Sequence, residues 1–159
     1  MENIILIGMP GCGKSTVGLL LAETISRPFI DMDKVLEEEA GQSIPEIFER
    51  EGEAGFRVRE TAILAEWCKQ SGLVIATGGG CVTREENFFH LRQNSIIVFL
   101  ERELTELKRE GRPLSQGNLN TMYEKRLPLY RRFADHTVQN DAEPTVVVRK
   151  ILDIMENLL

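Results

Sequence analysis

Cysteine is scarce in this chain and is not arranged as a redox or metal-binding pair. The sequence has 159 residues and three cysteines, Cys12, Cys68 and Cys81, which lie far apart and form no C-x-x-C motif. An odd number of separated cysteines favours free thiols over a disulfide framework, and free thiols persist in a reducing compartment. We therefore expect a cytoplasmic protein.

Long apolar runs and an excess of positive charge are also missing. No segment approaches the roughly 18 apolar residues of a membrane span, and the early run from Ile4 to Ile7 is too short for a secretory signal. The net charge of -6 argues against broad nucleic-acid binding, because neutralising phosphates requires a basic surface. We expect no membrane or nucleic-acid partner, and we expect a monomer.

The composition is otherwise that of a globular enzyme-sized domain. Hydrophobic residues make up 42% of the chain and charged residues 28%, so neither disorder nor a fibrous architecture is indicated. A chain of this length buries enough surface to fold without disulfides or a structural metal. A single α/β domain is the expectation.

Apolar runs of strand length recur along the chain and are continuous rather than alternating. Such runs are typical of parallel strands that are covered on both faces. The predicted strands of this kind are Ile4–Ile7, Phe29–Ile30, Leu73–Ala76 and Ile96–Leu100, and the less apolar His136–Gln139 is a fifth candidate.

Helical patterns separate these strands. Ser43 followed by Glu46, and Thr83 followed by Glu86, have the spacing of capping boxes and predict helices that begin just after Ser43 and Thr83. Pro144 suits the first position of a closing amphipathic helix. Two stretches, 34–70 and 111–120, do not fit a plain strand-helix alternation, and insertions of this kind are often lids or substrate platforms.

The segment from Gly8 to Ser15 matches the phosphate-loop motif G-x-x-x-x-G-K-[ST] between a predicted strand and a predicted helix. Its glycines let backbone N–H groups point at phosphates, Lys14 reaches the β- and γ-phosphates, and the Ser15 hydroxyl can ligate Mg²⁺. The candidate nucleotide-binding residues of this segment are Gly11, Cys12, Gly13, Lys14, Ser15 and Thr16.

The remaining motifs argue against two other users of such a loop. The strand Leu73–Ala76 ends in Thr77 and three glycines rather than in the adjacent acidic residues of an ATPase motor. The chain has no Asn-Lys-x-Asp guanine signature either. Both a motor and a GTPase are disfavoured, and a kinase is favoured.

Asp31 and Asp33 follow the second predicted strand. Alternation along an extended segment would put both carboxylates on one side, at the edge of the sheet where ligands of open α/β folds bind. One can hold the hydration shell of Mg²⁺ while the other accepts a hydrogen bond, or a proton, from an attacking hydroxyl. A plain N-cap of the next helix by Asp33 is the alternative.

Three consecutive glycines, Gly78, Gly79 and Gly80, follow the third predicted strand. They permit a close approach of backbone to a ligand, although a tight strand-to-helix turn explains them equally well. Arg57, Arg112 and Arg131 gain meaning only in combination with the other motifs.

Taken in order, the motifs resemble those of the shikimate kinase family. They are the phosphate loop, Asp31-x-Asp33, Phe56-Arg57-x-x-Glu60, Gly78-Gly79-Gly80, Arg112-Pro113-Leu114 and Leu129-Tyr130-Arg131. The resemblance implies phosphorylation of the 3-hydroxyl of shikimate by ATP with Mg²⁺, a step of aromatic amino-acid biosynthesis. It also implies a fold like that of the nucleoside-monophosphate kinases, with five parallel strands in the order 2-3-1-4-5 and helices on both faces.

The same resemblance divides the single domain into a core and two insertions. The core comprises residues of about 1–32, 62–108 and 135–159. A helical substrate-binding insertion spans about 33–61, and a lid spans about 109–124.

Roles at the acceptor side are implied by the resemblance as well. Asp33 would bind the shikimate hydroxyls and serve as the base, and Arg57 and Arg131 would clamp the substrate carboxylate. Gly79, in the middle of the glycine triplet, would donate its backbone N–H to the substrate. Glu60 would orient Arg57.

At the nucleotide side, the resemblance makes Lys14 and Arg112 catalytic cations. Arg112, from the lid, would close over the ATP phosphates. Ser15 would bind Mg²⁺ directly and Asp31 through water. Arg109 is a candidate adenine contact, although the chain between Arg109 and Arg112 is shorter than in the family.

Two other readings remain open from the sequence. A related small-molecule kinase, such as a gluconate kinase, would have no reason to pair Arg57 with Arg131. A non-catalytic nucleotide-binding module would not need Asp33 or Arg112.

Overall fold

The computed structural model describes residues 1–109 and 116–158, and its centre is a five-stranded parallel sheet in the order β2-β3-β1-β4-β5. The strands are β1 (Asn3–Ile7), β2 (Phe29–Asp31), β3 (Val74–Ala76), β4 (Ser95–Glu101) and β5 (His136–Gln139). Each coincides with one of the predicted strands to within two residues. The predicted strand order is confirmed.

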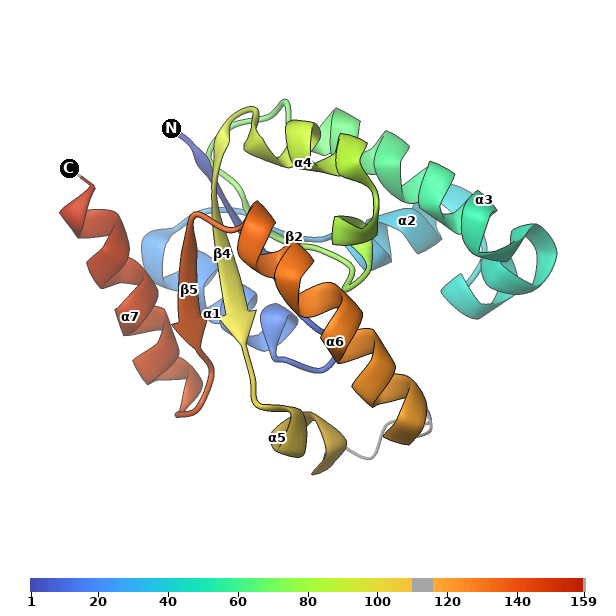
Figure 1. Ribbon diagram of the computed structural model, residues 1–159. Coiled ribbons are helices and arrows are strands. Elements are labelled where there is room, and N and C mark those ends of the chain that lie inside the picture. The colour runs from blue at the N-terminus through green and yellow to red at the C-terminus, as the bar shows by residue number, and fades with distance from the viewer. Residues whose placement is uncertain (110–115, 159) are drawn as a thin grey trace.

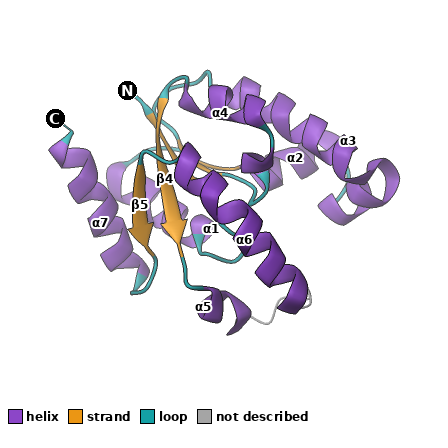
Figure 2. Ribbon diagram, viewed as in Figure 1, coloured by secondary structure: helices purple, strands orange, loops and turns teal. Residues whose placement is uncertain are grey.

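Helices cover both faces of this sheet, which explains why the central strands are apolar throughout. In Figure 1, helix α1 (Lys14–Ile25) lies behind β4, whereas helix α6 (Gln116–Phe133) lies to the right of β4 and its link to β5 passes in front of that strand. Figure 2 shows the same arrangement by element type. Every residue of β1 and β3 is buried. The core therefore lies on both sides of the sheet, and the carboxyl ends of the strands are left as the open edge.

The crossover from β2 to β3 holds two helices, α2 (Met32–Ala40) and α3 (Ile44–Trp67). The predicted capping box is confirmed at the start of α3, where the Glu46 N–H donates to the Ser43 hydroxyl at 3.3 Å and the Ser43 N–H donates to the Glu46 carboxylate. This cap starts the helix that carries Arg57 and Glu60.

Helix α3 is bent at Gly52, whose φ of 71° and ψ of 179° are not helical. That region of backbone space is accessible essentially to glycine alone. The bend lets Glu51 fold back onto Arg59, with an N–O distance of 2.8 Å from Nη2 to Oε2. The second half of α3, which carries Arg57 and Glu60, therefore begins at a defined bend.

The second predicted capping box is wrong. Residues Cys81–Thr83 form a short 3-10 turn, and α4 (Glu85–Arg92) begins after Arg84, which takes the N-cap position without a side-chain hydrogen bond. The Thr83 hydroxyl donates instead to the Gly80 carbonyl at 2.7 Å. The hydroxyl is thus used to close the turn after the glycine triplet.

The remaining helices follow β4 and β5. Helix α5 (Leu104–Arg109) precedes the undescribed stretch, and α7 (Pro144–Asn157) starts with Pro144 as predicted. The predicted lid, 109–124, falls partly outside the described residues, and its last part is the first half of α6. Within the part of the chain that is described, no helix is long and apolar enough to cross a membrane.

The backbone conformation of Gly52 yields a testable prediction, and Gly41 provides the control position. A Cβ at Gly52 or at Gly41 would meet nothing within 4 Å, but Gly41 has the left-handed φ of 65° and ψ of 22° that asparagine tolerates. We expect Gly52→Asn to lower the free energy of unfolding by about 1–3 kcal/mol and Gly41→Asn to cost much less. Chemical denaturation of both variants checks this, and equal losses would contradict it.

Candidate active site

A cavity of about 1310 Å³ opens at the carboxyl edge of the sheet. Its lining includes the loop after β1, the carboxylates Asp31 and Asp33 and the backbone of Gly79. Residues 139–144, from the end of β5 to the start of α7, line it as well. The strand order thus brings the phosphate loop and the acidic residues predicted from the sequence into one space.

The phosphate loop wraps around the side chain of its own lysine. Lys14 is only 8% exposed, and its ammonium donates to the carbonyls of Gly8 at 2.7 Å and Met9 at 3.0 Å. Gly11 and Gly13 have φ values of 80° and 96°, which curl the backbone around that charge. The buried cation is satisfied by loop carbonyls, and phosphate oxygens are the other acceptors it is placed to meet.

Two side chains from distant parts of the chain hold this loop. The Asn140 amide donates to the Cys12 carbonyl at 2.6 Å, and the Arg102 guanidinium donates to the Gly11 carbonyl at 3.2 Å. Both side chains also line the cavity, so their contacts fix this part of the loop at the cavity wall. Sequence reasoning missed both residues, because neither contact belongs to a local motif.

Asp31 does two things at once. One carboxylate oxygen accepts the N–H groups of Asp33 and Lys34 at 3.1 and 3.4 Å, which makes Asp31 the N-cap of α2. The other accepts the Ser15 hydroxyl at 3.1 Å. Both the predicted extended segment through Asp33 and the alternative of Asp33 as the cap are wrong, because the chain turns into helix at Met32 as soon as Asp31 can cap it.

The pair of Ser15 and Asp31 fits a hard divalent cation. A hydroxyl and a carboxylate oxygen lie together at the start of α1, and such oxygen ligands suit Mg²⁺. Among the described residues, no group of three or more acidic, histidine or cysteine side chains is gathered to hold a metal. An ion here would take its remaining ligands from phosphate oxygens and water, as Mg²⁺ commonly does.

Asp33 lies in the first turn of α2 and faces the cavity. Burial, with the nearby charge of Asp31, raises the pKa of Asp33, and the charges of Lys14 and Arg57 act in the opposite direction. The ionised form of this carboxylate is therefore less stable here than in water. Such a group is poised to accept a proton or a hydroxyl hydrogen bond.

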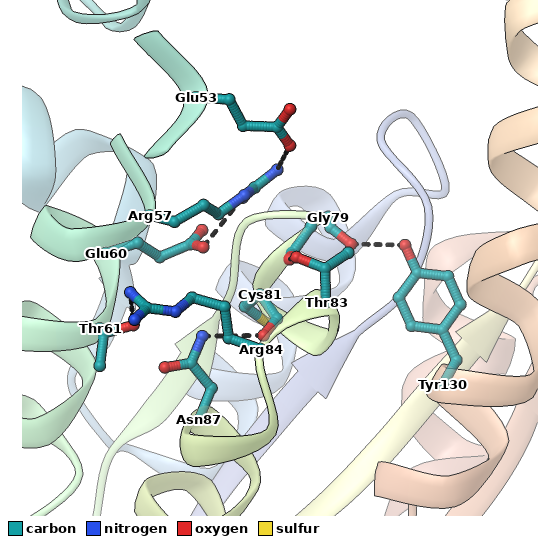
Figure 3. A network of polar contacts seen from close by, with 11 residues as sticks. Glu53, Arg57, Glu60, Thr61, Gly79, Cys81, Thr83, Arg84, Asn87 and Tyr130 are labelled. Carbon is teal, nitrogen blue, oxygen red and sulfur yellow. Dashed lines mark hydrogen bonds and ion pairs between the residues drawn. The ribbon is translucent and has the colours of Figure 1, made fainter. Parts of the chain in front are cut away.

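Arg57 is held by two carboxylates of its own helix. Figure 3 shows its guanidinium between Glu60, at 2.9 Å, and Glu53, at 3.5 Å. Glu60 is 3% exposed, and burial raises its pKa while Arg57 lowers it. The Arg57 Nε is buried without a hydrogen-bond partner. The contact of Glu60 with Arg57 is the one expected from the sequence.

Each glycine of the triplet makes room for a different part of the site. A Cβ at Gly78 would lie 2.7 Å from a Glu60 oxygen and 2.9 Å from an Asp33 oxygen. A Cβ at Gly79 would lie 2.6 Å from the Pro10 ring of the phosphate loop, and one at Gly80 would overlap the Arg57 guanidinium. The requirement for glycine is one of space, since none of the three has a positive φ.

Arg131 does not accompany Arg57, and the expected pairing needs correction. Arg131 is 62% exposed, and its described partner is Glu101, at 3.6 Å. Arg126, five residues earlier on α6, instead lies near enough to act electrostatically on both Glu60 and Tyr130. Positions five apart face different directions on a helix, so only one of the two can point to the acceptor side.

Of the two arginines expected at the nucleotide, the structure describes the position of one along the chain. Arg109 is the last residue of α5, and Arg112 lies outside the described residues. Thr16 lines the cavity beside Ser15. The roles of Arg109 and Arg112 stay predictions.

The phosphate loop shares its cavity with a carboxylate whose pKa is raised, and an arginine lies beside that carboxylate. Phosphoryl transfer from a nucleotide to a small anionic alcohol uses groups of these kinds. The fold and site together define a phosphate-loop kinase of small molecules. A family model described as shikimate kinase matches residues 10–156. The chain belongs to the shikimate kinase family.

Relatives of known name and structure agree with that assignment. The shikimate kinase of Pseudomonas entomophila is 44% identical, over 99% of this chain and 96% of its own length. A shikimate kinase from Acinetobacter baumannii, solved in complex with shikimate, has a TM-score of 0.92 and 38% identity, covering 99% of this chain and 94% of that one. The enzyme from Aquifex aeolicus has a TM-score of 0.88 and 35% identity, with 98% and 96% covered.

More distant kinases share the fold alone. A gluconokinase from Sinorhizobium meliloti superposes with a TM-score of 0.64 at 19% identity, covering 99% of this chain and 95% of that one. At this identity the likeness describes the architecture of the sheet and helices.

The environment of Asp33 predicts that its charge weakens the ligand-free fold. Its pKa is raised from the usual 3.8, so the folded state binds the proton more tightly than the unfolded state does. The stability of the protein then falls as pH rises from that value through the folded pKa, and the full penalty is present above it. We expect Asp33→Asn to raise the melting temperature by a few degrees at neutral pH, with the gain shrinking in acid.

The exposed Asp153 of α7 provides the matched control, since Asp153→Asn removes the same charge without relieving any burial. Thermal unfolding of the three proteins across pH measures the difference. A loss of stability in Asp33→Asn at neutral pH would show that its attraction to Lys14 and Arg57 outweighs its burial.

Proposed function

We propose that this enzyme transfers the γ-phosphoryl group of ATP to the 3-hydroxyl of shikimate and forms shikimate 3-phosphate. The observation that carries the proposal is the convergence of Asp33, Glu60 and Arg57 on the glycine triplet, where Asp33 and Gly79 line the same cavity as the phosphate loop. Membership of the family and the likeness to an enzyme solved with shikimate support it. The step would serve aromatic amino-acid biosynthesis.

At the acceptor end, positive and negative groups match the two kinds of polar group on shikimate. Arg57, held by Glu60 and Glu53, offers a planar guanidinium to the carboxylate of the substrate. Arg126 is the better candidate than Arg131 for the second arm of this clamp, because it lies near Glu60. Asp33 would accept hydrogen bonds from the ring hydroxyls, and the glycine triplet would supply backbone N–H donors.

At the donor end, the triphosphate would occupy the loop from Gly8 to Ser15. Binding would draw the Lys14 ammonium from the carbonyls of Gly8 and Met9 to the β- and γ-phosphates. Arg112 would complete the charge around the transferring group, and Arg109 would contact the adenine. The cavity wall at residues 139–144 is the surface left for the base.

A magnesium ion held by Ser15 directly and by Asp31 through water would neutralise charge on the phosphates. The protein's own contribution is position and electrostatics, since phosphoryl transfer passes through a loose transition state. Asp33 would orient the attacking hydroxyl and accept its proton, a role that its raised pKa favours. Asp33→Asn, which stabilises the fold, would therefore lower kcat.

The division of the chain follows from these roles. Residues of about 33–61 would form the substrate-binding insertion and about 109–124 the lid, on a core that holds the nucleotide. We further propose that the enzyme acts in the cytoplasm, in keeping with three buried free thiols, and that it acts as a monomer.

The acceptor is tested directly by ADP release in a coupled assay with ATP and Mg²⁺. We expect shikimate to stimulate release, and gluconate and nucleoside monophosphates to leave it at background, because neither offers a carboxylate and a ring hydroxyl at the spacing of Arg57 and Asp33. Lys14→Ala, which removes the phosphate-binding cation, is the control for contaminating kinases. If gluconate alone stimulates ADP release, the acceptor is gluconate and not shikimate.

The two arginines of α6 form a matched pair for testing the carboxylate clamp. We expect Arg126→Ala to raise the KM for shikimate about tenfold or more, the loss of a charge-assisted hydrogen bond, with little change in the KM for ATP. Arg131→Ala should change the KM for shikimate little. Steady-state kinetics of both variants decide between them, and the opposite result would restore Arg131 to the clamp.

A further inference from the structure

A tyrosine that no proposed step uses touches the glycine triplet. The Tyr130 hydroxyl donates to the Gly79 carbonyl at 2.6 Å, across 51 residues of sequence (Figure 3). Tyr130 is 1% exposed, and its ring stacks on Phe99 of β4 with centroids 5.0 Å apart. The ring is therefore fixed by the core, and its one polar atom is aimed at the triplet.

All three carbonyls of the triplet are hydrogen-bonded on the protein's side. The Gly78 carbonyl accepts the Cys81 N–H at 3.3 Å, and the Gly80 carbonyl accepts the N–H and hydroxyl of Thr83 at 3.0 and 2.7 Å. Gly79 is the one of the three whose carbonyl is held by a side chain from another element. Tyr130 thus donates a hydrogen bond to the carbonyl of the middle glycine, whereas residues of the 3-10 turn donate to the carbonyls of the other two.

Holding the Gly79 carbonyl also orients an N–H group. The carbonyl of Gly79 and the N–H of Gly80 belong to one planar peptide unit and point in opposite directions. Because the Gly79 carbonyl points to the Tyr130 hydroxyl, the Gly80 N–H is directed away from Tyr130. Figure 3 shows Tyr130 on one side of Gly79 and Arg57 on the other. Among the hydrogen bonds of the described residues, none is donated by the N–H of Gly79 or Gly80.

We propose that Tyr130 is a positioning residue for the acceptor: its hydroxyl holds the Gly79–Gly80 peptide so that the Gly80 N–H faces the bound acceptor. The inference rests on the proposed function, since it concerns the same acceptor site. Tyr130 touches no substrate itself. It acts through the backbone, and its effect is on binding and alignment of the alcohol that receives the phosphoryl group.

The neighbouring arginine strengthens this arrangement. Burial raises the pKa of the Tyr130 hydroxyl, and Arg126, one helical turn earlier, offsets part of that rise through its charge and a hydrogen bond. A donor that is itself polarised by a cation makes a stronger hydrogen bond, and the effect passes along a chain of such bonds. Consecutive hydrogen bonds therefore link Arg126, Tyr130 and the Gly79–Gly80 peptide. They connect the proposed carboxylate clamp to the backbone N–H donor.

Tyr130→Phe tests the proposal because it removes only the hydroxyl and keeps the ring on Phe99. We expect the KM for shikimate to rise about 3- to 10-fold, as for the loss of one hydrogen bond, while the KM for ATP stays at the wild-type value. Tyr123→Phe, at a half-buried tyrosine of the same helix, should leave both constants unchanged. Thermal unfolding verifies that the variants are folded.

A second readout follows the peptide itself. In wild-type protein labelled with ¹⁵N, shikimate should shift the Gly80 amide proton downfield, and in Tyr130→Phe the shift should be smaller. An unchanged KM for shikimate in Tyr130→Phe, or equal rises in the constants for shikimate and ATP, would overturn the inference. If wild-type enzyme fails to phosphorylate shikimate, the proposed function itself fails, and this inference fails with it.

Discussion

The lack of side chains at three consecutive positions after β3 is the constraint on which the proposed acceptor site depends. The phosphate loop, the Asp33 and Glu60 carboxylates and the Arg57 guanidinium all approach this backbone closer than a methyl group would allow. The loop after β1 and the helices α2 and α3 thereby meet at one short stretch of chain. A side chain at Gly78 would displace the two carboxylates, one at Gly79 would displace the phosphate loop, and one at Gly80 would displace Arg57.

The same crowding sets the electrostatics of the site. Burial raises the pKa of both Asp33 and Glu60, the charge of Asp31 adds to the rise at Asp33, and that of Asp33 adds to the rise at Glu60. Arg57 offsets part of the rise at both carboxylates, and Lys14 offsets part of it at Asp33. The Lys14 ammonium is itself satisfied by carbonyls of its own loop. Charges held in this way lower the stability of the fold, and they favour a ligand that brings opposite charges. Active sites commonly lower the stability of a protein in this manner.

The parts of the molecule that sequence reasoning predicted are those with local physical causes. Continuous apolar runs marked four of the five strands, because strands covered on both faces are mostly apolar. The fifth, β5, gave a weaker signal, since Val138 is its one buried residue. The Ser43 cap and the phosphate loop were predicted because their geometry is contained within a few adjacent residues. Thr83 has the same capping spacing as Ser43, yet its hydroxyl is used by Gly80, and nothing in the local sequence distinguishes the two. Asp31 and Asp33 were identified, but which of them caps the helix was not, since that depends on where the strand ends.

The sequence by itself determined the class of fold, the nucleotide loop and the set of residue types that resembles one kinase family. Only the tertiary structure decided which arginine of α6 lies near Glu60, which side chains hold the phosphate loop, and why three glycines are needed. Arg126 and Arg131 lie five positions apart on one helix and face different directions, so Arg126 acts on Glu60 while Arg131 is exposed beside Glu101. The contacts of Asn140, Arg102 and Tyr130 join residues 51 to 128 positions apart. Such contacts leave no periodic or local signal, because they arise only when the sheet has brought the ends of its strands together.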